Sequence, residues 1–175
     1  MNNFVFKALH VVAWIIFVGL CIEAGGLLVN FLVSIFKPEF IGNLYQKLDL
    51  TELYHENKSV FYGLYGFVLF IAVLKAILFY IVIELLLKLD MSKPFSGFVA
   101  KKISQISYYT FFIGILSYIA RQTAQSMSHH GYEIDKLDRF WVDSQAFILM
   151  AAVVYIIATI FKKGIEIQSE NDLTV

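Results

Sequence analysis

The feature that most constrains this chain is a set of four long apolar stretches. They run over about 8–36, 60–87, 103–120 and 140–161. Each is long enough to cross a hydrocarbon core of roughly 30 Å as an α-helix. We therefore predict an all-α polytopic membrane protein, with four transmembrane helices forming one domain over residues 1–175.

The composition supports a membrane protein and excludes one class of partner. Hydrophobic residues make up 59% of the 175 positions and charged residues 16%, which is rare in a water-soluble domain. Fourteen basic and fourteen acidic residues leave no net charge and form no block of one sign. Because a polyanion needs a basic footprint, we expect no direct contact with nucleic acid, and the lipid bilayer is the first partner.

The first apolar stretch is predicted to remain as a helix and not to be removed as a signal peptide. It is preceded by one basic residue, Lys7, and stays apolar far beyond the usual length of a signal sequence, with no A-x-A cleavage site. The single cysteine, Cys21, falls inside this stretch and is expected to be a packed thiol.

Basic residues predict how the chain is oriented, because cytoplasmic loops retain Lys and Arg. The short connection between the second and third stretches is net positive, with Lys88, Lys93, Lys101 and Lys102 against Asp90. The two other loops dilute their basic residues with acidic ones. We therefore place this connection and both termini in the cytoplasm.

Small and polar residues predict how the helices pack, because helices in lipid associate through such residues. They recur at spacings of three, four and seven, and a period of 3.5 favours left-handed crossings near 20° in a four-helix bundle. These stripes are Gly19, Glu23, Gly26 and Asn30 in the first stretch, Ser107, Thr110, Gly114, Ser117 and Arg121 in the third, and Ser144, Ala151 and Ala158 in the fourth.

Glu23 and Lys75 are the ionisable residues deepest in the predicted spans, where an unpaired charge costs several kcal/mol. Glu23 lies about 22 Å and Lys75 about 18 Å from the inner ends of their helices. Because consecutive antiparallel helices usually neighbour one another, we predict an ion pair between them. The pair would fix helix register, or would form a proton, ion or substrate site; the alternative is unpaired exposure to a water-filled cavity. Asn30 is the third polar residue of this region.

Four further polar residues lie nearer the membrane surfaces. His10 and Glu84 match in depth, but their angular positions do not allow them to share a seam with Glu23 and Lys75. We expect both to reach the inner headgroups separately. Arg121 and Asp143, at the outer ends of the third and fourth helices, are expected to form a water-exposed bridge of little energetic value.

The two outer loops contain apolar residues at helical spacing. They are Phe40, Leu44 and Leu48 in the first loop, and Ile134, Leu137 and Trp141 in the second. This pattern predicts short amphipathic helices that lie on the membrane surface, with a functional outer cap as the alternative.

No pattern of catalytic or metal-binding residues stands out. A bis-histidine haem needs two facing imidazoles, but His10 is the one histidine inside a predicted span, and a thiol oxidoreductase needs paired cysteines. His129, His130 and Glu133 could contribute to a metal site, but Gly131 interrupts them and a polar surface is the simpler interpretation. With no nucleophile, zinc-protease or phosphate-binding motif, we expect no enzyme activity, cofactor or metal.

Two segments carry a resemblance to a known family. The first is the connection Lys93-Pro94-Phe95-Ser96, followed by a basic helix start. The second is the C-terminal run 160–175, with Phe161, Lys163, Gly164, Gln168, Glu170, Asp172 and Thr174 at the matching positions. Together they resemble a bacterial family of integral membrane proteins catalogued as domain of unknown function 2975. The resemblance implies four spans in a bacterial inner membrane and no established activity. It also implies, by association, a small soluble helix-turn-helix regulator as a partner.

Two functions follow as hypotheses. The first is a non-enzymatic inner-membrane protein with a regulatory or scaffolding role, in which the cytoplasmic connection and the C-terminal tail form one docking surface. Its expected residues are Lys93, Pro94, Phe95, Lys101, Lys102, Gly164, Gln168, Glu170 and Asp172. The alternative is a small transporter or ion-translocating protein that uses Glu23 and Lys75.

Overall fold

The structure, a computed structural model, describes residues 3–43, 50–89, 94–132, 134–141 and 143–172. Its described residues form helices and no strand, and four helices are long and apolar enough to cross a membrane, which confirms the all-α, four-span class. The elements are α1 (Asn3–Phe36), η1 (Pro38–Asn43), α2 (Thr51–Glu56), α3 (Lys58–Lys88), α4 (Gly97–His129), η3 (Asp135–Phe140) and α5 (Ser144–Asp172).

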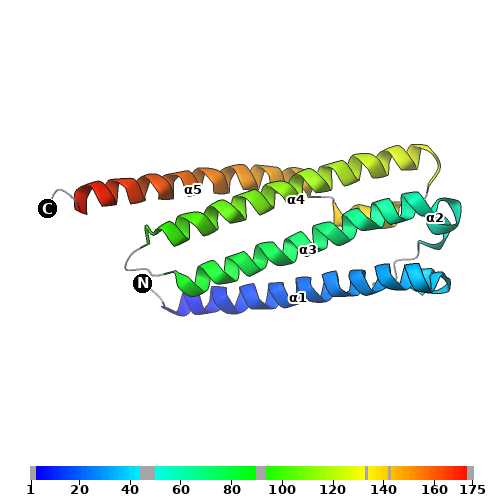
Figure 1. Cartoon of the computed structure of the whole chain (residues 1–175), viewed down its shortest axis with the longest axis horizontal. Coiled ribbons are helices and arrows are strands. Elements are labelled where there is room, and N and C mark those ends of the chain that lie inside the picture. The colour runs from blue at the N-terminus through cyan, green and yellow to red at the C-terminus, as the bar shows by residue number, and fades with distance from the viewer. Residues whose placement is uncertain (1–2, 44–49, 90–93, 133, 142, 173–175) are drawn as a thin grey trace.

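The four long helices lie side by side in the order α1, α3, α4, α5 (Figure 1). Each packs mainly on its neighbours in this row, so α1 contacts chiefly α3 and α5 contacts chiefly α4. Whether the helices close into the predicted four-helix bundle stays a prediction. The start of α1, the end of α5 and the α3–α4 connection lie at one end, which we call the terminal end (Figure 1). The opposite end, formed with η1, α2 and η3, is the cap end. The handedness of the helix crossings stays a prediction.

The structure shows why α4 and α5 begin at other residues than predicted. The Ser96 hydroxyl accepts a hydrogen bond from the backbone N–H of Val99 at 3.3 Å, so α4 begins at Gly97. At its other end α4 continues to His129, and Gly131 then turns the chain at φ +94°, a conformation that favours glycine. The third span is therefore longer at both ends than 103–120. The fourth begins at Ser144, not near 140, because the preceding residues form η3.

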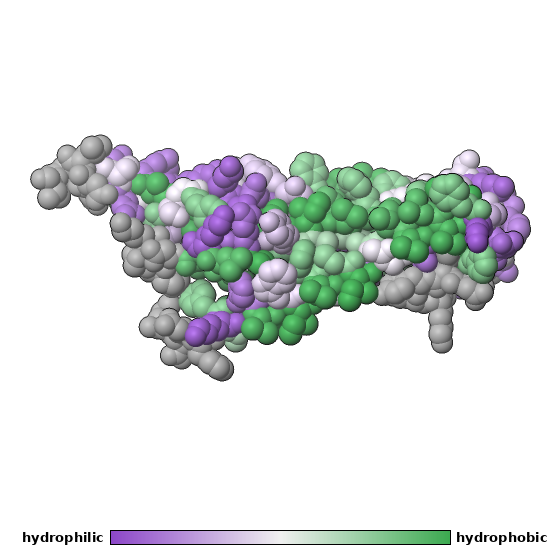
Figure 2. Space-filling model, turned by 60° about the horizontal axis from the view of Figure 1, so that its bottom comes forward, coloured by the Kyte–Doolittle hydropathy of each residue, from purple (hydrophilic) through white to green (hydrophobic). Residues whose placement is uncertain are grey.

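Large apolar side chains cover the outside of the molecule between its two polar ends. In Figure 2 the hydrophobic colour covers the middle of the visible face, and the hydrophilic colour concentrates towards the ends. Ile15 and Ile22 of α1 and Leu149 of α5 are examples of this exposed apolar surface. Such a surface is stable in lipid and unfavourable in water.

The cap end holds the best-packed part of the core, and much of it is aromatic. The ring centroids of Tyr54 and Phe61 lie 5.3 Å apart, and those of Phe31 and Tyr65 lie 5.7 Å apart. The Tyr65 hydroxyl donates a hydrogen bond to the backbone carbonyl of Leu27 at 3.1 Å. These contacts fix α1 and α2 against α3.

The prediction that the apolar residues between α4 and α5 are turned to the membrane surface is wrong. Ile134, Leu137 and Trp141 are buried in the core, with Trp141 only 1% exposed, because η3 packs against both α3 and α4. The Trp141 indole N–H is satisfied by the Asp138 carboxylate at 3.1 Å. In the first loop, Phe40 is 48% exposed, while Leu44 and Leu48 lie outside the described residues.

Candidate functional site

The α3–α4 connection lies against the part of α5 that extends beyond its apolar stretch. The ring centroids of Phe95 and Phe161 are 5.3 Å apart. Phe95 also covers Gly164, where a Cβ atom would come within 2.6 Å of Phe95 Cδ1. Because Gly164 has no side chain, the Phe95 ring can lie directly on the α5 backbone. The connection and the tail are thus in direct contact.

Next to this contact, Glu84 of α3 is paired with Lys102 of α4. The Lys102 ammonium donates to the Glu84 carboxylate at 2.6 Å, and Lys88 approaches the other oxygen at 3.4 Å. Both ammonium groups also lie against the Phe98 ring, at 5.7 and 5.3 Å from its centroid. The sequence predicts no partner for Glu84, and the structure shows that α4 supplies it with a cation. Lys102 is only 13% exposed and is not a free surface lysine.

One further residue predicted for the docking surface, Lys101, lines a groove between α4 and α5 at the terminal end. This terminal groove has a volume of about 460 Å³, with Gly97, Ala100, Lys101 and Ser104 on one wall and Lys162, Ile165 and Glu166 on the other. Pro94 is partly buried, whereas Lys101, Gln168 and Glu170 are exposed. Lys93 and the side chain of Asp172 lie outside the described residues.

Glu23 and Lys75 do not meet within one copy of the chain, so the predicted ion pair is wrong. The ammonium of Lys75 lies 5.7 Å from the centroid of Phe147 on α5, and neither residue forms an ion pair in the described part of the chain. The depth match was sound, since aromatic contacts hold α1 and α3 in the expected register.

The angular positions on the helices explain why the pair does not form. The α1 residues packed on α3 include Leu27, Ala24 and Phe31, which lie about 40° to 100° around the helix from Glu23, all on the same side of it. Lys75 lies on the side of α3 that carries Leu78 and Val82, and this side is turned towards α5. The two helices are neighbours, but these two side chains leave them in different directions.

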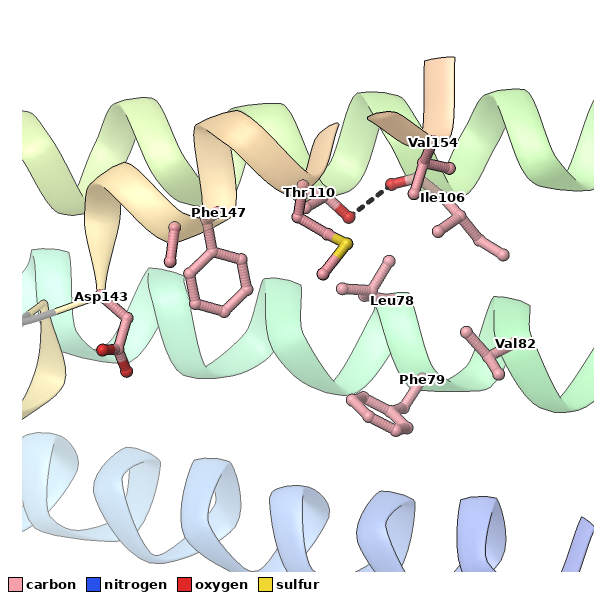
Figure 3. Close-up of a pocket in the computed structure, with 10 residues that line it drawn as sticks. Leu78, Phe79, Val82, Ile106, Thr110, Asp143, Phe147 and Val154 are labelled. Atoms are coloured by element: carbon pink, nitrogen blue, oxygen red, sulfur yellow. Dashed lines mark hydrogen bonds between the residues drawn. The ribbon is translucent and has the colours of Figure 1, made fainter. Parts of the chain in front are cut away.

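The structure also places three other sets of predicted polar residues, and it contradicts the expected bridge between Arg121 and Asp143. The ring of His10 accepts a hydrogen bond from the Trp14 indole at 3.1 Å, within α1. The Nδ2 atom of Asn30 is buried and has no hydrogen-bond partner among the described residues. Arg121 and Asp143 form no ion pair in the described structure, because Asp143 turns from the start of α5 towards α3 (Figure 3).

Asp143 lies instead at one end of a second groove, which we call the lateral groove. It runs between α3 and α5 over α4 and has a volume of about 470 Å³ (Figure 3). The hydroxyl of Thr110 donates to the backbone carbonyl of Ile106 at 2.7 Å, so it is satisfied within α4. The lining is therefore almost wholly apolar: Leu78, Phe79, Val82, Ile106, Thr110, Asp143, Ala146, Phe147, Met150 and Val154.

The described residues contain no group of three or more His, Cys, Asp or Glu side chains placed to hold a metal ion. His129 and His130 are exposed at the end of α4, and Glu133 lies outside the described residues.

Comparison with known protein families shows which family the chain belongs to. Residues 43–175, more than half of the chain, match the model of a protein family of unknown function, DUF2975. The chain belongs to this family. The match confirms the resemblance that the connection and the tail indicate, and the DUF2975 region extends from the last residue of η1 to the C-terminus. No curated protein and no solved structure matches the chain.

Several features of this DUF2975 member were not expected from its sequence. The pair between Glu84 and Lys102 joins residues 18 positions apart across the α3–α4 connection. The sequence signal that could have indicated this pair is that Glu84 and Lys102 lie near the facing ends of two consecutive helices. The aromatic cluster and the lateral groove depend on which faces of α3, α4 and α5 meet, and helical periodicity alone does not determine this.

Proposed function

We propose that this DUF2975 protein is a non-enzymatic protein of the bacterial inner membrane that docks a soluble regulatory partner at its cytoplasmic side. The observation that carries the proposal is the packing of Phe95 on Gly164. This contact joins the α3–α4 connection and the α5 extension into one surface, whereas two independent mobile segments would have to be ordered separately when a partner binds.

The distribution of basic residues supports a cytoplasmic location for the terminal end. Lys88, Lys101, Lys102, Lys162 and Lys163 all lie near this end, close to the limits of the apolar helices. Lysine-rich segments next to transmembrane helices are retained on the cytoplasmic side. Both termini are then cytoplasmic as well.

The chemistry of the terminal end suits binding to a protein. Phe95 is 42% exposed and Ile167 is 58% exposed, and residues of both charge signs, Lys101 and Glu166, line the terminal groove at the same end. Exposed apolar anchors surrounded by polar groups are typical of protein interfaces. From Phe161 to the end of α5 the helix extends by roughly 16 Å, far enough to project beyond the bilayer.

A small helix-turn-helix regulator is the partner class that the family association supports. In this proposal the regulator contacts DNA, and the membrane protein holds or releases the regulator. The alternative, a transporter using Glu23 and Lys75, lacks a shared site because the two side chains leave their helices in different directions.

Binding to such a regulator tests the proposal. The full chain in lipid nanodiscs is titrated with the purified regulator encoded beside a family member, and the bound fraction is measured by fluorescence anisotropy. Phe95→Ser and Ile167→Glu should each weaken binding, whereas Phe112→Ser, at an exposed position in the middle of α4, should not. Equal affinity of the three variants would contradict the proposed surface.

The side of the membrane is tested separately by cysteine labelling in a Cys21→Ser background. Ser96→Cys and Ser169→Cys should react with a membrane-impermeant maleimide only after the cells are opened. Glu39→Cys should react in intact cells. Labelling of Ser96→Cys and Glu39→Cys from the same face would show that the topology is wrong.

A further inference from the structure

The helix α1 is the least buried of the four spans, and one of its flanks carries the carboxyl side chain of Glu23. It packs on α3 through Ala24, Leu27 and Phe31, which leaves Glu23 on a neighbouring flank. Glu23 is partly exposed and forms no ion pair with any described residue. A carboxylate at this depth in lipid is unfavourable unless it finds a partner.

The matching positive charge lies at the lateral groove. Lys75 points towards the groove wall at Phe147, and a cation over an aromatic face is only weakly compensated. Lys75 lies about 25 Å along α3 from its cap end and about 20 Å from its terminal end, near the middle of the bilayer. A phospholipid headgroup, which stays at the membrane surface, does not reach this depth.

Glu23 and Lys75 also lie at the same depth. Phe17 contacts Tyr80 at a centroid distance of 6.0 Å and Phe31 contacts Tyr65 at 5.7 Å. Interpolating between these two contacts places Glu23 within about one helical turn of the level of Lys75.

The Glu23 flank and the lateral groove open on the same side of the row of helices. Each residue is rotated by about 100° from the one before it, and because α1 and α3 are antiparallel the rotation runs clockwise in one helix and anticlockwise in the other when both are viewed from the same end. The faces by which α1 and α3 pack point towards each other. Glu23 and Phe79 each lie to one side of these faces, and the opposite rotations place both on the same side of the plane through the two helices. Phe79 lines the groove on that side (Figure 3).

We propose that two copies of the chain pair across a twofold axis along the membrane normal, with α1 of each copy seated in the lateral groove of the other. In this dimer Glu23 of one copy pairs with Lys75 of the second copy. A rotation about the membrane normal preserves depth, so two residues at equal depth in one copy meet at equal depth across the interface. The twofold rotation gives the dimer two such ion pairs, one from Glu23 of each copy.

The glycines beside Glu23 favour this arrangement. A Cβ atom added to Gly19 would meet nothing within 4 Å, so the surface at this position is open in one copy. Glycines on such a surface let a second helix approach closely in lipid. The groove supplies an almost wholly apolar surface on which the exposed apolar side of α1 can pack.

A charge exchange between two differently tagged copies tests the ion pair. The Glu23→Lys copy alone and the Lys75→Glu copy alone place like charges together twice, so the dimer association constant in nanodiscs should fall about tenfold or more. When the two variants are coexpressed, both pairs are restored in the mixed dimer. The two tags should then co-purify about as well as two wild-type copies. Failure of the mixture to associate better than either variant alone would overturn the pair.

Cross-linking with the native charges in place tests the seating of α1 without relying on those variants. In a Cys21→Ser background, Gly19→Cys on one tagged copy should cross-link to Val154→Cys on the other. Within one copy α1 and α5 lie at opposite sides of the row, so they do not produce this product. The matched controls are Val18→Cys, on another face of α1, and Ile156→Cys, outside the groove lining; both should cross-link poorly.

Equal cross-linking of the controls, or a wild-type chain that stays monomeric with a lipid in the groove by native mass spectrometry, would overturn the dimer.

Discussion

The ring of Phe95 lies on the backbone of Gly164, and it is the contact through which the α3–α4 connection meets the α5 extension. An added Cβ at position 164 would come within 2.6 Å of the ring, so a larger residue must displace Phe95. Because Phe95 is 42% exposed, it can move without disturbing the helices. The contact is therefore sensitive to substitution while the transmembrane fold is not.

The pair between Glu84 and Lys102 should stabilise the packing of α3 on α4. Glu84→Gln leaves the ammonium of Lys102 with little access to water and without its carboxylate, so the melting temperature in detergent should fall. Adding Lys102→Met removes the stranded charge and should recover part of the loss. Lys88→Met is the control, because the Lys88 side chain is 61% exposed and its ion pair with Glu84 contributes little to stability. A loss from Lys88→Met as large as that from Glu84→Gln would contradict the assignment.

Gly114 should be required for the close approach of α4 and α5. A Cβ at this position would lie 2.7 Å from Ile148 Cγ1 and 3.0 Å from the Ile148 backbone nitrogen, which cannot move independently of its helix. Gly114→Ala should therefore destabilise the fold by about 1–3 kcal/mol, measured by equilibrium unfolding in detergent. Gly63→Ala is the matched control.

At Gly63 an added Cβ meets nothing within 4 Å, so the better helix propensity of alanine should stabilise the protein by up to about 1 kcal/mol. A stabilising Gly114→Ala would show that the two helices are not packed as closely as described.

The hydroxyl of Tyr65 should contribute to the attachment of α1. Tyr65→Phe removes the hydrogen bond to the Leu27 carbonyl and leaves that buried acceptor without this donor, at a cost of about 0.5–1.5 kcal/mol in unfolding free energy. Tyr118→Phe, at an exposed position of α4, should have little effect. Equal effects of the two substitutions would argue against a buried hydrogen bond between α1 and α3.

The number and type of helices were predictable because apolar length alone identifies a membrane span. The same hydropathy could not show that residues 134–141 turn inward, since an apolar segment packs equally well on lipid or on protein. Trp141 is buried because η3 fits against α3 and α4, and this depends on tertiary packing.

The candidate site was predicted in part, for a related reason. Matching depth gave the correct register for Glu23 and Lys75, because the rise per residue of a helix is fixed. The direction in which each side chain leaves its helix depends on which face packs. The face of α1 that meets α3 includes Leu27 and Ala24, to one side of Glu23, whereas Lys75 lies on the side of α3 that is turned towards α5. The sequence did not predict the pair between Glu84 and Lys102 for the same reason, because it does not show which faces of α3 and α4 meet.

The contact between Phe95 and Gly164 can be tested directly by disulfide formation in native membranes. In a Cys21→Ser background, Phe95→Cys with Gly164→Cys should oxidise rapidly, because the two positions are in contact. Phe95→Cys with Lys163→Cys is the matched control, since the exposed Lys163 side chain is held by Glu166 at 2.6 Å on a different face of α5. Rapid oxidation of the first pair alone is the expected result. Equal and slow oxidation of both pairs would show that the connection and the tail do not form one surface.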